Sequence, residues 1–375
     1  MRRSWRWVVV AAATVGVVSL PLVARLLPGE GTPVGVRTLL ARIAGSAGVG
    51  YSGFAESHST LAVPTAGAGV TGIFAPLATV LAETSQLRVW WRDADDWRVD
   101  RIKATGESGL RETGGALWQW EYETGSLRRS TLRPTVRAPR PDDLVPPGLA
   151  RRLLGEARAD EVSAIPGRRV AGERTDGLRL RVTDRRSTLD HVDVWALPAS
   201  GLPVRVDVHA RGAAGSGGPV LSTSFLDLTV ARPPAGTIAF TPPDGVATQE
   251  DDVDIVSVID RFSGAVPPAR LAGLPRRTDL DLGAVGVYGR GLTLVVAIPM
   301  RPRVADRVVP VVRAAPGAVE DESGIAAGIG PLRLQLSPPT GHGSRWLLAG
   351  TLSPSALRAA ARDLPPARAA TRPAR

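Results

Sequence analysis

Cysteine is absent from the 375 residues of the chain, and lysine occurs once, at Lys103. The lack of cysteine excludes disulfides, a lipid-modified N-terminal cysteine, cysteine-ligated zinc and thiol catalysis. Arginine therefore carries nearly all of the positive charge, while alanine, glycine and proline are abundant. This bias is typical of a GC-rich genome, so it reflects codon usage before it reflects function.

Histidine is scarce, and the spacings that bind metals or support catalysis are missing. The four histidines are His58, His191, His209 and His342, and they form no HxxxH or HExxH motif. His191 is expected to occupy a solvated strand position. No Gly-x-Ser-x-Gly motif occurs, and the acidic turn at residues 93–96 lacks the glycine and glutamate of a calcium loop. We expect no catalytic residue, no metal, no cofactor and no enzymatic activity.

The bulk composition bounds the fold class and the partners. A chain of this length with 43% hydrophobic residues can form two domains, each with its own core. The 41 glycines and 32 prolines indicate many turns between short strands and argue against a helical bundle. The net charge of +10 would suit either nucleic acid or an anionic membrane surface.

The N-terminal segment favours a membrane surface over nucleic acid as the partner. Residues 1–7 are basic, residues 8–24 are apolar and uncharged, and the run stops at Arg25. With its flanking tryptophans and leucines it approaches the roughly 20 residues that span a bilayer. Pro21 and Leu22 make a poor cleavage site before Ala24. We expect an uncleaved signal-anchor helix over residues 1–28, with one pass through the cell membrane, the bulk of the chain extracytoplasmic and no nucleic-acid partner.

Five of the nine tryptophans fall within residues 87–122, which are predicted to form an antiparallel meander. Alternation gives each strand one apolar side, so the meander is predicted to have a single wide aromatic face. Such a face has two interpretations. It can be the buried side of an ordinary core, or a curved sheet can keep part of it for an apolar ligand. Periodicity alone does not separate these alternatives.

The rest of the chain is predicted to add strands to this sheet and then to form a second domain. A helix is expected from Val36 to Ala47, a strand over residues 51–61, and an amphipathic helix over residues 73–81 that could lie across the mouth of the sheet. Further strands are expected over residues 169–173, 178–184, 191–197, 203–211, 220–230 and 237–240. Together with the meander they suit one large antiparallel sheet that curls.

A shift to prolines and acids at residues 241–254 is typical of a domain boundary. Beyond it, strands are expected over residues 284–288, 292–298, 332–336 and 345–352, with helices over 304–312 and 355–364. Ser353 before Pro354 is a good N-cap for the last helix. The predicted units are the anchor (1–28), a first domain (33–243), a linker (244–278), a second domain (279–365) and a disordered basic tail (366–375).

Four motifs, taken in order, resemble those of a known family. They are LLARIAGSAGVGYSGF (39–54), DVWALPASGLPVRVDVHARG followed by VLSTSFLDLTV (193–230), VGVYGRGLTLVVAIP (285–299) and WLLAGTLSPSALRAAARDL (346–364). The sequence is similar to the extracytoplasmic sigma-E regulatory proteins of the RseB/MucB family, whose first domain has the fold of the lipoprotein carriers LolA and LolB. The tryptophan meander is closer to the carriers than to the regulators, and the insertion at 64–83 fits neither tightly.

The resemblance implies an α+β protein. Its first domain would be a large curved antiparallel sheet, a LolA-like half-barrel with covering helices that accommodates acyl chains. A smaller α+β domain would dock a membrane protein's extracytoplasmic segment. Under this interpretation the pocket wall is formed by Val89, Trp91, Trp97, Val99, Trp118, Trp120 and Tyr122. The lid is formed by Phe74 and Leu77.

Three functions are compatible with these features. The expected one is a membrane-anchored regulator that senses envelope lipids and contacts an anti-sigma factor or another membrane partner. The alternative is a carrier or chaperone of LolA type, which hands lipids or acylated proteins to a membrane transporter or another membrane component. An exported hydrolase is a third possibility that lacks any catalytic spacing. The strand arginines Arg88, Arg92, Arg98 and Arg101 could bind lipid phosphates or form a solvated face.

Overall fold

The structure is a computed structural model, and it describes residues 33–61, 84–104, 106–132, 137, 139–212, 217–250, 266–280, 282–315, 317–340 and 343–365. The predicted anchor, the predicted lid helix with Phe74 and Leu77, and the basic tail lie outside these residues. No helix within the described part of the chain is long and apolar enough to cross a membrane.

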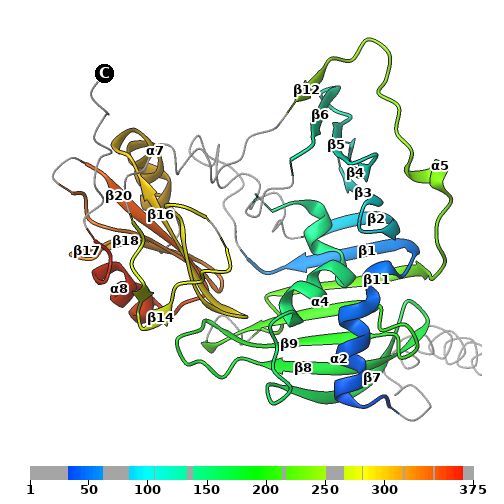
Figure 1. Ribbon diagram of the computed structural model, residues 1–375, viewed down its shortest axis with the longest axis horizontal. Coiled ribbons are helices and arrows are strands. Elements are labelled where there is room, and N and C mark those ends of the chain that lie inside the picture. Colours follow the sequence, from blue (N-terminus) through cyan, green and yellow to red (C-terminus); the bar gives the residue numbers. More distant parts are fainter. Residues whose placement is uncertain are drawn as a thin grey trace, which may run out of the picture.

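A twelve-stranded sheet forms the first and larger part of the molecule (Figure 1). Its strand order is β12-β6-β5-β4-β3-β2-β1-β11-β10-β9-β8-β7. The strands are β1 (Tyr51–Ser59), β2 (Thr84–Asp93), β3 (Asp96–Lys103), β4 (Gly106–Thr113), β5 (Ala116–Glu121), β6 (Ser126–Ser130), β7 (Val162–Val170), β8 (Glu173–Arg181), β9 (Leu189–Ala196), β10 (Pro203–Ala210), β11 (Leu221–Thr229) and β12 (Thr248–Glu250).

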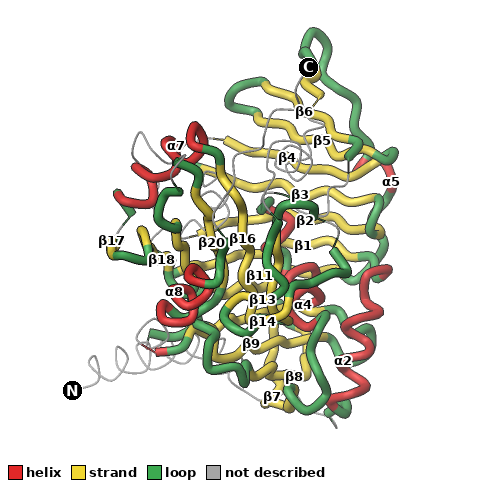
Figure 2. Tube along the Cα trace, turned by 60° about the vertical axis from the view of Figure 1, so that its left-hand side comes forward, coloured by secondary structure: helices red, strands yellow, loops and turns green. Residues whose placement is uncertain are grey.

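Two meanders, β1–β6 and β7–β11, meet where β1 pairs with β11, and Figure 2 shows the strands side by side across both. Every pair is antiparallel except β12 with β6, which is parallel. The sheet is therefore mixed, whereas a purely antiparallel one was predicted. Its two edges, β12 and β7, do not pair with each other, so it stays open as a half-barrel does.

Two helices pack on one face of the β7–β11 half. They are α2 (Val36–Gly45) and α4 (Pro146–Leu154), with the short turns η1 (Ser46–Gly48) and η2 (Pro141–Leu144) beside them. Leu39 and Ile43 recur at helical spacing in α2 and lie in one core with Ala150 and Leu154 of α4. Prolines occupy the first two positions of α4, where their missing N–H groups cost no hydrogen bond. These helices fix one wall of the curved sheet.

A six-stranded antiparallel sheet forms the second domain, in the order β15-β16-β20-β19-β18-β17. Helix α7 packs on one of its faces and α8 on the other. Ser353 caps α8, because its Oγ accepts a hydrogen bond from the Ala356 amide at 3.3 Å, as predicted. The elements are β15 (Gly286–Arg290), β16 (Thr293–Met300), α7 (Pro302–Arg313), β17 (Val319–Asp321), β18 (Gly324–Ile329), β19 (Leu332–Leu336), β20 (Arg345–Gly350) and α8 (Pro354–Arg362).

The range predicted as a linker, 244–278, contributes strands to both domains. Strand β12 extends the large sheet at β6. The hairpin of β13 (Arg270–Leu271) and β14 (Leu274–Pro275) belongs to the second domain, because Leu271 and Leu274 pack there with Tyr288 and Trp346. Neither contribution has a strong apolar alternation, so composition alone indicated a connection.

Candidate functional site

The register of β2–β5 decides which tryptophans share a face. Trp91 pairs with Trp97, Trp97 with Glu112, and Glu112 with Leu117. Directly paired residues of antiparallel strands point to the same side, so these four form what we call the inner face. Trp118 is the next residue after Leu117 and points the other way.

The prediction of one wide aromatic face was therefore wrong. Trp118, Trp120 and Tyr122 lie on the opposite, outer face of β5 and its continuation, because their positions alternate with the inner-face residues Leu117 and Gln119. A shift of one residue in register moves a whole strand's side chains to the other face. The predicted wall is thus split between the two sides of the sheet.

Much of the inner face is filled by the protein's own side chains. Val89 and Val99 are 0% and 1% exposed, and they share a core with Tyr51, Leu144 and Phe225. Leu144 belongs to η2, which crosses this part of the sheet. For Val89 and Val99 the structure therefore shows ordinary core packing.

The packed region ends at Trp91 and Trp97, which form an aromatic stack with Tyr51. The Tyr51 and Trp91 rings lie 6.1 Å apart with 9° between their planes, and the Trp91 and Trp97 rings lie 5.9 Å apart at 12°. The Trp91 indole N–H donates to the Ala47 carbonyl at 2.9 Å, which fixes its orientation. Arg140 lies 5.9 Å from the centre of the Trp97 ring, within the range of a cation–π contact.

A cavity of about 290 Å³ opens beside this stack. Its apolar lining is made by Trp91, Trp97, Leu117 and Leu132, whereas Arg137, Arg140 and Arg152 are the basic residues around it. The volume is just below the range of small-molecule pockets, which begins at roughly 300 Å³. Among the predicted wall residues, Trp91 and Trp97 line this cavity; the lid residues Phe74 and Leu77 lie outside the described part of the chain.

Two aspartates hold the arginines at the mouth of the cavity. Arg137 binds both oxygens of Asp143 at 2.7 and 2.8 Å, and Arg140 binds both oxygens of Asp142 at 2.9 and 3.0 Å. Arg152 also pairs with Asp143. Burial alone would raise the pKa of Asp143, but the bonds from Arg137 and the Arg140 amide outweigh it and lower that pKa to about 2. The mouth is therefore held together by a network of ion pairs in which the low pKa of Asp143 keeps that carboxyl ionised near neutral pH.

The outer face is covered by a return segment, residues 231–240, which includes the short helix α5 (Ala235–Ile238). Phe240 packs against Trp118 with 5.4 Å between ring centres. Arg92 donates to the Pro233 carbonyl, and Arg98 to the Thr237 carbonyl at 3.5 Å. Arg92 and Arg98 therefore help to attach the return segment to the sheet.

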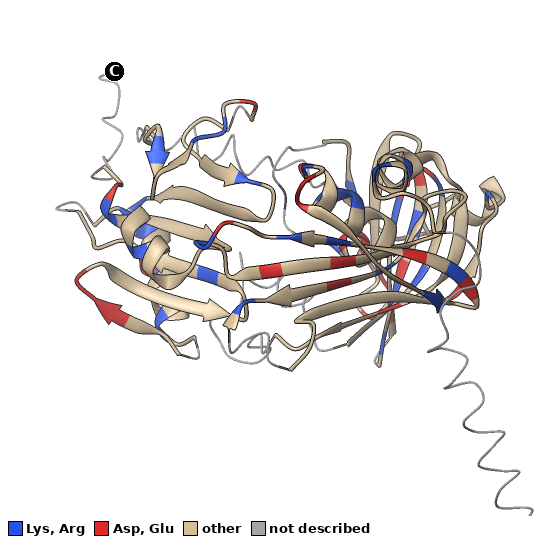
Figure 3. Ribbon diagram, turned by 90° about the horizontal axis from the view of Figure 1, so that it is seen from below, with Lys and Arg blue, Asp and Glu red and all other residues tan. Residues whose placement is uncertain are grey.

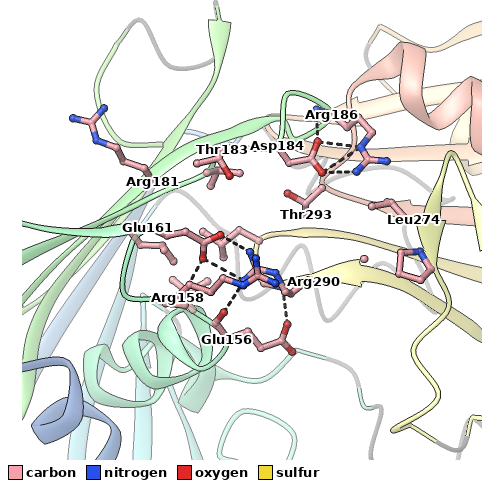
Figure 4. Close-up of a pocket in the computed structure, with 18 residues that line it drawn as sticks. Glu156, Arg158, Glu161, Arg181, Thr183, Asp184, Arg186, Leu274, Arg290 and Thr293 are labelled. Carbon is pink, nitrogen blue, oxygen red and sulfur yellow. Dashed lines mark hydrogen bonds and ion pairs between the residues drawn. The ribbon is translucent and has the colours of Figure 1, made fainter. Parts of the chain in front are cut away.

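A second cavity, of about 330 Å³, lies between the large sheet and the second domain (Figure 4). Arg290 of β15 pairs with Glu161, and its Nη1 donates to the Glu156 carbonyl at 2.8 Å. The Gly291 amide donates to the Glu156 carboxylate at 2.6 Å. The bonds from Arg290 lower the pKa of Glu161, which keeps it ionised. This cavity is part of a polar interface between the domains.

The loop between β8 and β9 completes that interface. The Thr188 amide donates to the Thr351 carbonyl at 2.8 Å, and the Ser353 amide donates to the Arg186 carbonyl at 2.6 Å. Arg186 also donates to the Ala272 carbonyl at 2.8 Å. Sequence reasoning missed these contacts, because nothing in the local pattern links segments more than 80 residues apart.

Sequence reasoning also missed a group of three polar side chains on β9 and β10. His191, Asp193 and His209 lie together because β9 pairs with β10 with His191 directly opposite His209. Strands were predicted over residues 191–197 and 203–211, and pairing them outwards from the residues between them would have placed the two histidines opposite each other.

No family model and no curated protein matches the sequence. Among solved structures the chain is similar to MucB in the Pseudomonas aeruginosa MucA/MucB complex, with 15% identity, 88% of this chain and 98% of that chain covered, and a TM-score of 0.49. It is also similar to MucB in complex with MucA(peri), with 14% identity, 89% and 100% covered, and a TM-score of 0.47.

A LolA superfamily protein from Nitrosomonas europaea is similar over 55% of this chain and 98% of its own length, with 12% identity and a TM-score of 0.24.

Proposed function

We propose that this chain is an extracytoplasmic binding protein with a regulatory role, and that the cavity beside Trp91 and Trp97 takes the acyl chain of a lipid or of an acylated protein. The proposal rests on one observation, the presence of this cavity on the inner face. The inner face is closed by core packing up to the tryptophan stack and then opens, with an apolar floor and a charged mouth.

The chemistry of the cavity suits a molecule with one apolar part and one polar part. Indole faces and leucines bury a hydrocarbon at roughly 25 cal/mol per Å² of apolar area. The guanidinium groups of Arg137, Arg140 and Arg152 can donate to polar head oxygens, although Asp142 and Asp143 already occupy many of their donors. A volume near 290 Å³ takes a single chain segment and excludes a whole multi-chain lipid.

The regulatory part of the proposal concerns the second domain. MucB has been solved in complex with MucA, and we propose an anti-sigma factor or another single-pass membrane protein as the partner here. Residues 1–28 would keep the chain at the membrane. In a pull-down from envelope extract a regulator retains such a partner, whereas the alternative, a carrier of LolA type, retains a membrane transporter or none.

Filling the cavity tests the binding site directly. Leu117→Trp adds bulk at the cavity wall, so it is expected to weaken binding of a brominated fatty acid at least about tenfold, because the acyl chain loses its space. Binding is measured as quenching of tryptophan fluorescence by the bromine atoms.

Trp120→Ala is the matched control, since Trp120 lies on the outer face of the same strand. It should leave the affinity unchanged. Equal weakening by both variants, or by neither, would reject the cavity as the site.

A further inference from the structure

On the outward face of β9 and β10, three potential metal ligands converge. His191 and Asp193 alternate along β9 with Val192 and Val194, which pack toward α2 and α4, so the two polar residues point away from the helices. His209 joins them from β10, and its ring stacks on that of His191 with 4.1 Å between centres and 13° between planes. One ligand atom of each residue lies within 4.8 Å of those of the other two.

The orientation of His191 is fixed by a carboxylate outside the cluster. Its Nδ1 lies 2.7 Å from Asp190 Oδ2, and because an ionised carboxylate can only accept a hydrogen bond, Nδ1 is the atom that carries the proton. With the Nδ1 proton directed at Asp190, Nε2 is the ring atom that can present a lone pair to a metal ion. That atom is buried and has no hydrogen-bond partner among the described residues. A carboxylate behind a histidine is the arrangement that orients metal-binding imidazoles.

The carboxylate of Asp193, another of the potential ligands, is also held in place by hydrogen bonds. Arg179 donates to both oxygens of Asp193 at 2.6 Å, which leaves each oxygen a further lone pair. Asp193 Oδ2 lies 3.9 Å from His191 Nε2. The neighbouring Asp207 accepts from Arg205 at 3.0 Å and from Ser222 at 2.6 Å, and it does not belong to the three-residue cluster. Figure 3 shows the acidic and basic residues interspersed on this sheet.

We propose that His191, Asp193 and His209 bind a divalent first-row transition-metal ion, with Zn²⁺ as the first candidate and water completing the shell. Two imidazoles and one carboxylate are the donor set that such ions prefer, whereas Mg²⁺ and Ca²⁺ prefer oxygen alone. Metal ions bind the neutral form of imidazole, so binding at this site is expected to be pH-dependent. The site is separate from the cavity beside Trp91, so it stands independently of the proposed function.

The test is calorimetric titration of the full chain with ZnCl₂ after treatment with a chelator. The wild-type chain is expected to bind one equivalent, and His191→Gln and His209→Gln are expected to weaken binding at least about tenfold. His58→Gln is the matched control, because His58 is exposed and also contacts a carboxylate, that of Glu56 at 2.6 Å. It should bind as the wild type does.

Two further measurements keep the test decisive if a histidine variant fails to fold. Asp190 is half exposed, so Asp190→Asn should leave the fold intact and still weaken Zn²⁺ binding about 10- to 100-fold. Co²⁺ should give the wild-type chain a visible absorption band that Zn²⁺ abolishes. A wild-type chain that takes up neither ion at one equivalent, or an Asp190→Asn chain with unchanged affinity, would overturn the proposal.

Discussion

Asp143 illustrates how one side chain can organise the mouth of a cavity. Its carboxylate accepts from Arg137, Arg152 and the Arg140 amide, and its side chain is 14% exposed. Loss of its charge would leave the partly buried Arg137 guanidinium without its bidentate partner, which is costly. The arrangement of the arginines around the cavity therefore depends on the ionisation of Asp143.

The pH dependence of stability follows from the pKa of Asp143. That pKa falls from 3.8 to about 2 on folding, so the stabilisation is complete above pH 4 and is lost as the pH falls from about 4 to 2. Asp143→Asn should lower the free energy of unfolding by about 2 kcal/mol at pH 7 and by much less near pH 2. Urea unfolding at both pH values checks this.

Glu320→Gln serves as the control for that comparison, because the Glu320–Arg313 pair is more than half exposed. It should change stability little at either pH. An Asp143→Asn deficit of equal size at pH 7 and pH 2 would show that the loss is steric and unrelated to charge.

At the scale of elements, alternation and turn residues predicted most strands of both domains and the cap of α8. The register of β5 could not be predicted, because Leu117, Trp118, Gln119 and Trp120 put a large side chain on each face. The split of the tryptophans follows from pairing with β4, which is a long-range property. Strand β12 escaped prediction since Thr-Gln-Glu has no apolar side at all.

The return segment over the outer face depends on Ile238, which is 0% exposed in α5 beside β2 and β3. Ile238→Ala removes buried methyl and methylene groups and leaves a space, so it should lower the free energy of unfolding by about 2–5 kcal/mol. Leu226→Ala, at a residue 54% exposed, should cost less than about 0.5 kcal/mol. Similar losses in chemical denaturation would contradict the covering role of the segment.

At the scale of the whole molecule, polar contacts between the domains restrict how the second domain can move. Ion pairs of Arg290 with Glu161 and backbone bonds at Thr188 and Ser353 connect them. The second domain can therefore move relative to the large sheet only if these contacts break. The sequence predicted two domains but not their contacts, which join residues far apart in the chain.

Arg290→Ala should loosen that interface without unfolding either domain. The amides of Thr188 and Ser353 are then expected to exchange hydrogen about fivefold faster, because their bonds cross the interface. Hydrogen exchange followed by mass spectrometry checks this. Arg313→Ala, which breaks an exposed ion pair within the second domain, is the control and should leave the exchange rates of both amides unchanged. Unchanged exchange rates in Arg290→Ala would show that Arg290 does not stabilise the interface.

Native mass spectrometry of the full chain, purified gently from the envelope of its own host, tests the acyl-binding cavity most directly. We expect a population carrying one bound lipid or acyl group, which is lost in Leu117→Trp and retained in Trp120→Ala. A wild-type protein that is always found at its bare mass would contradict acyl binding in this cavity.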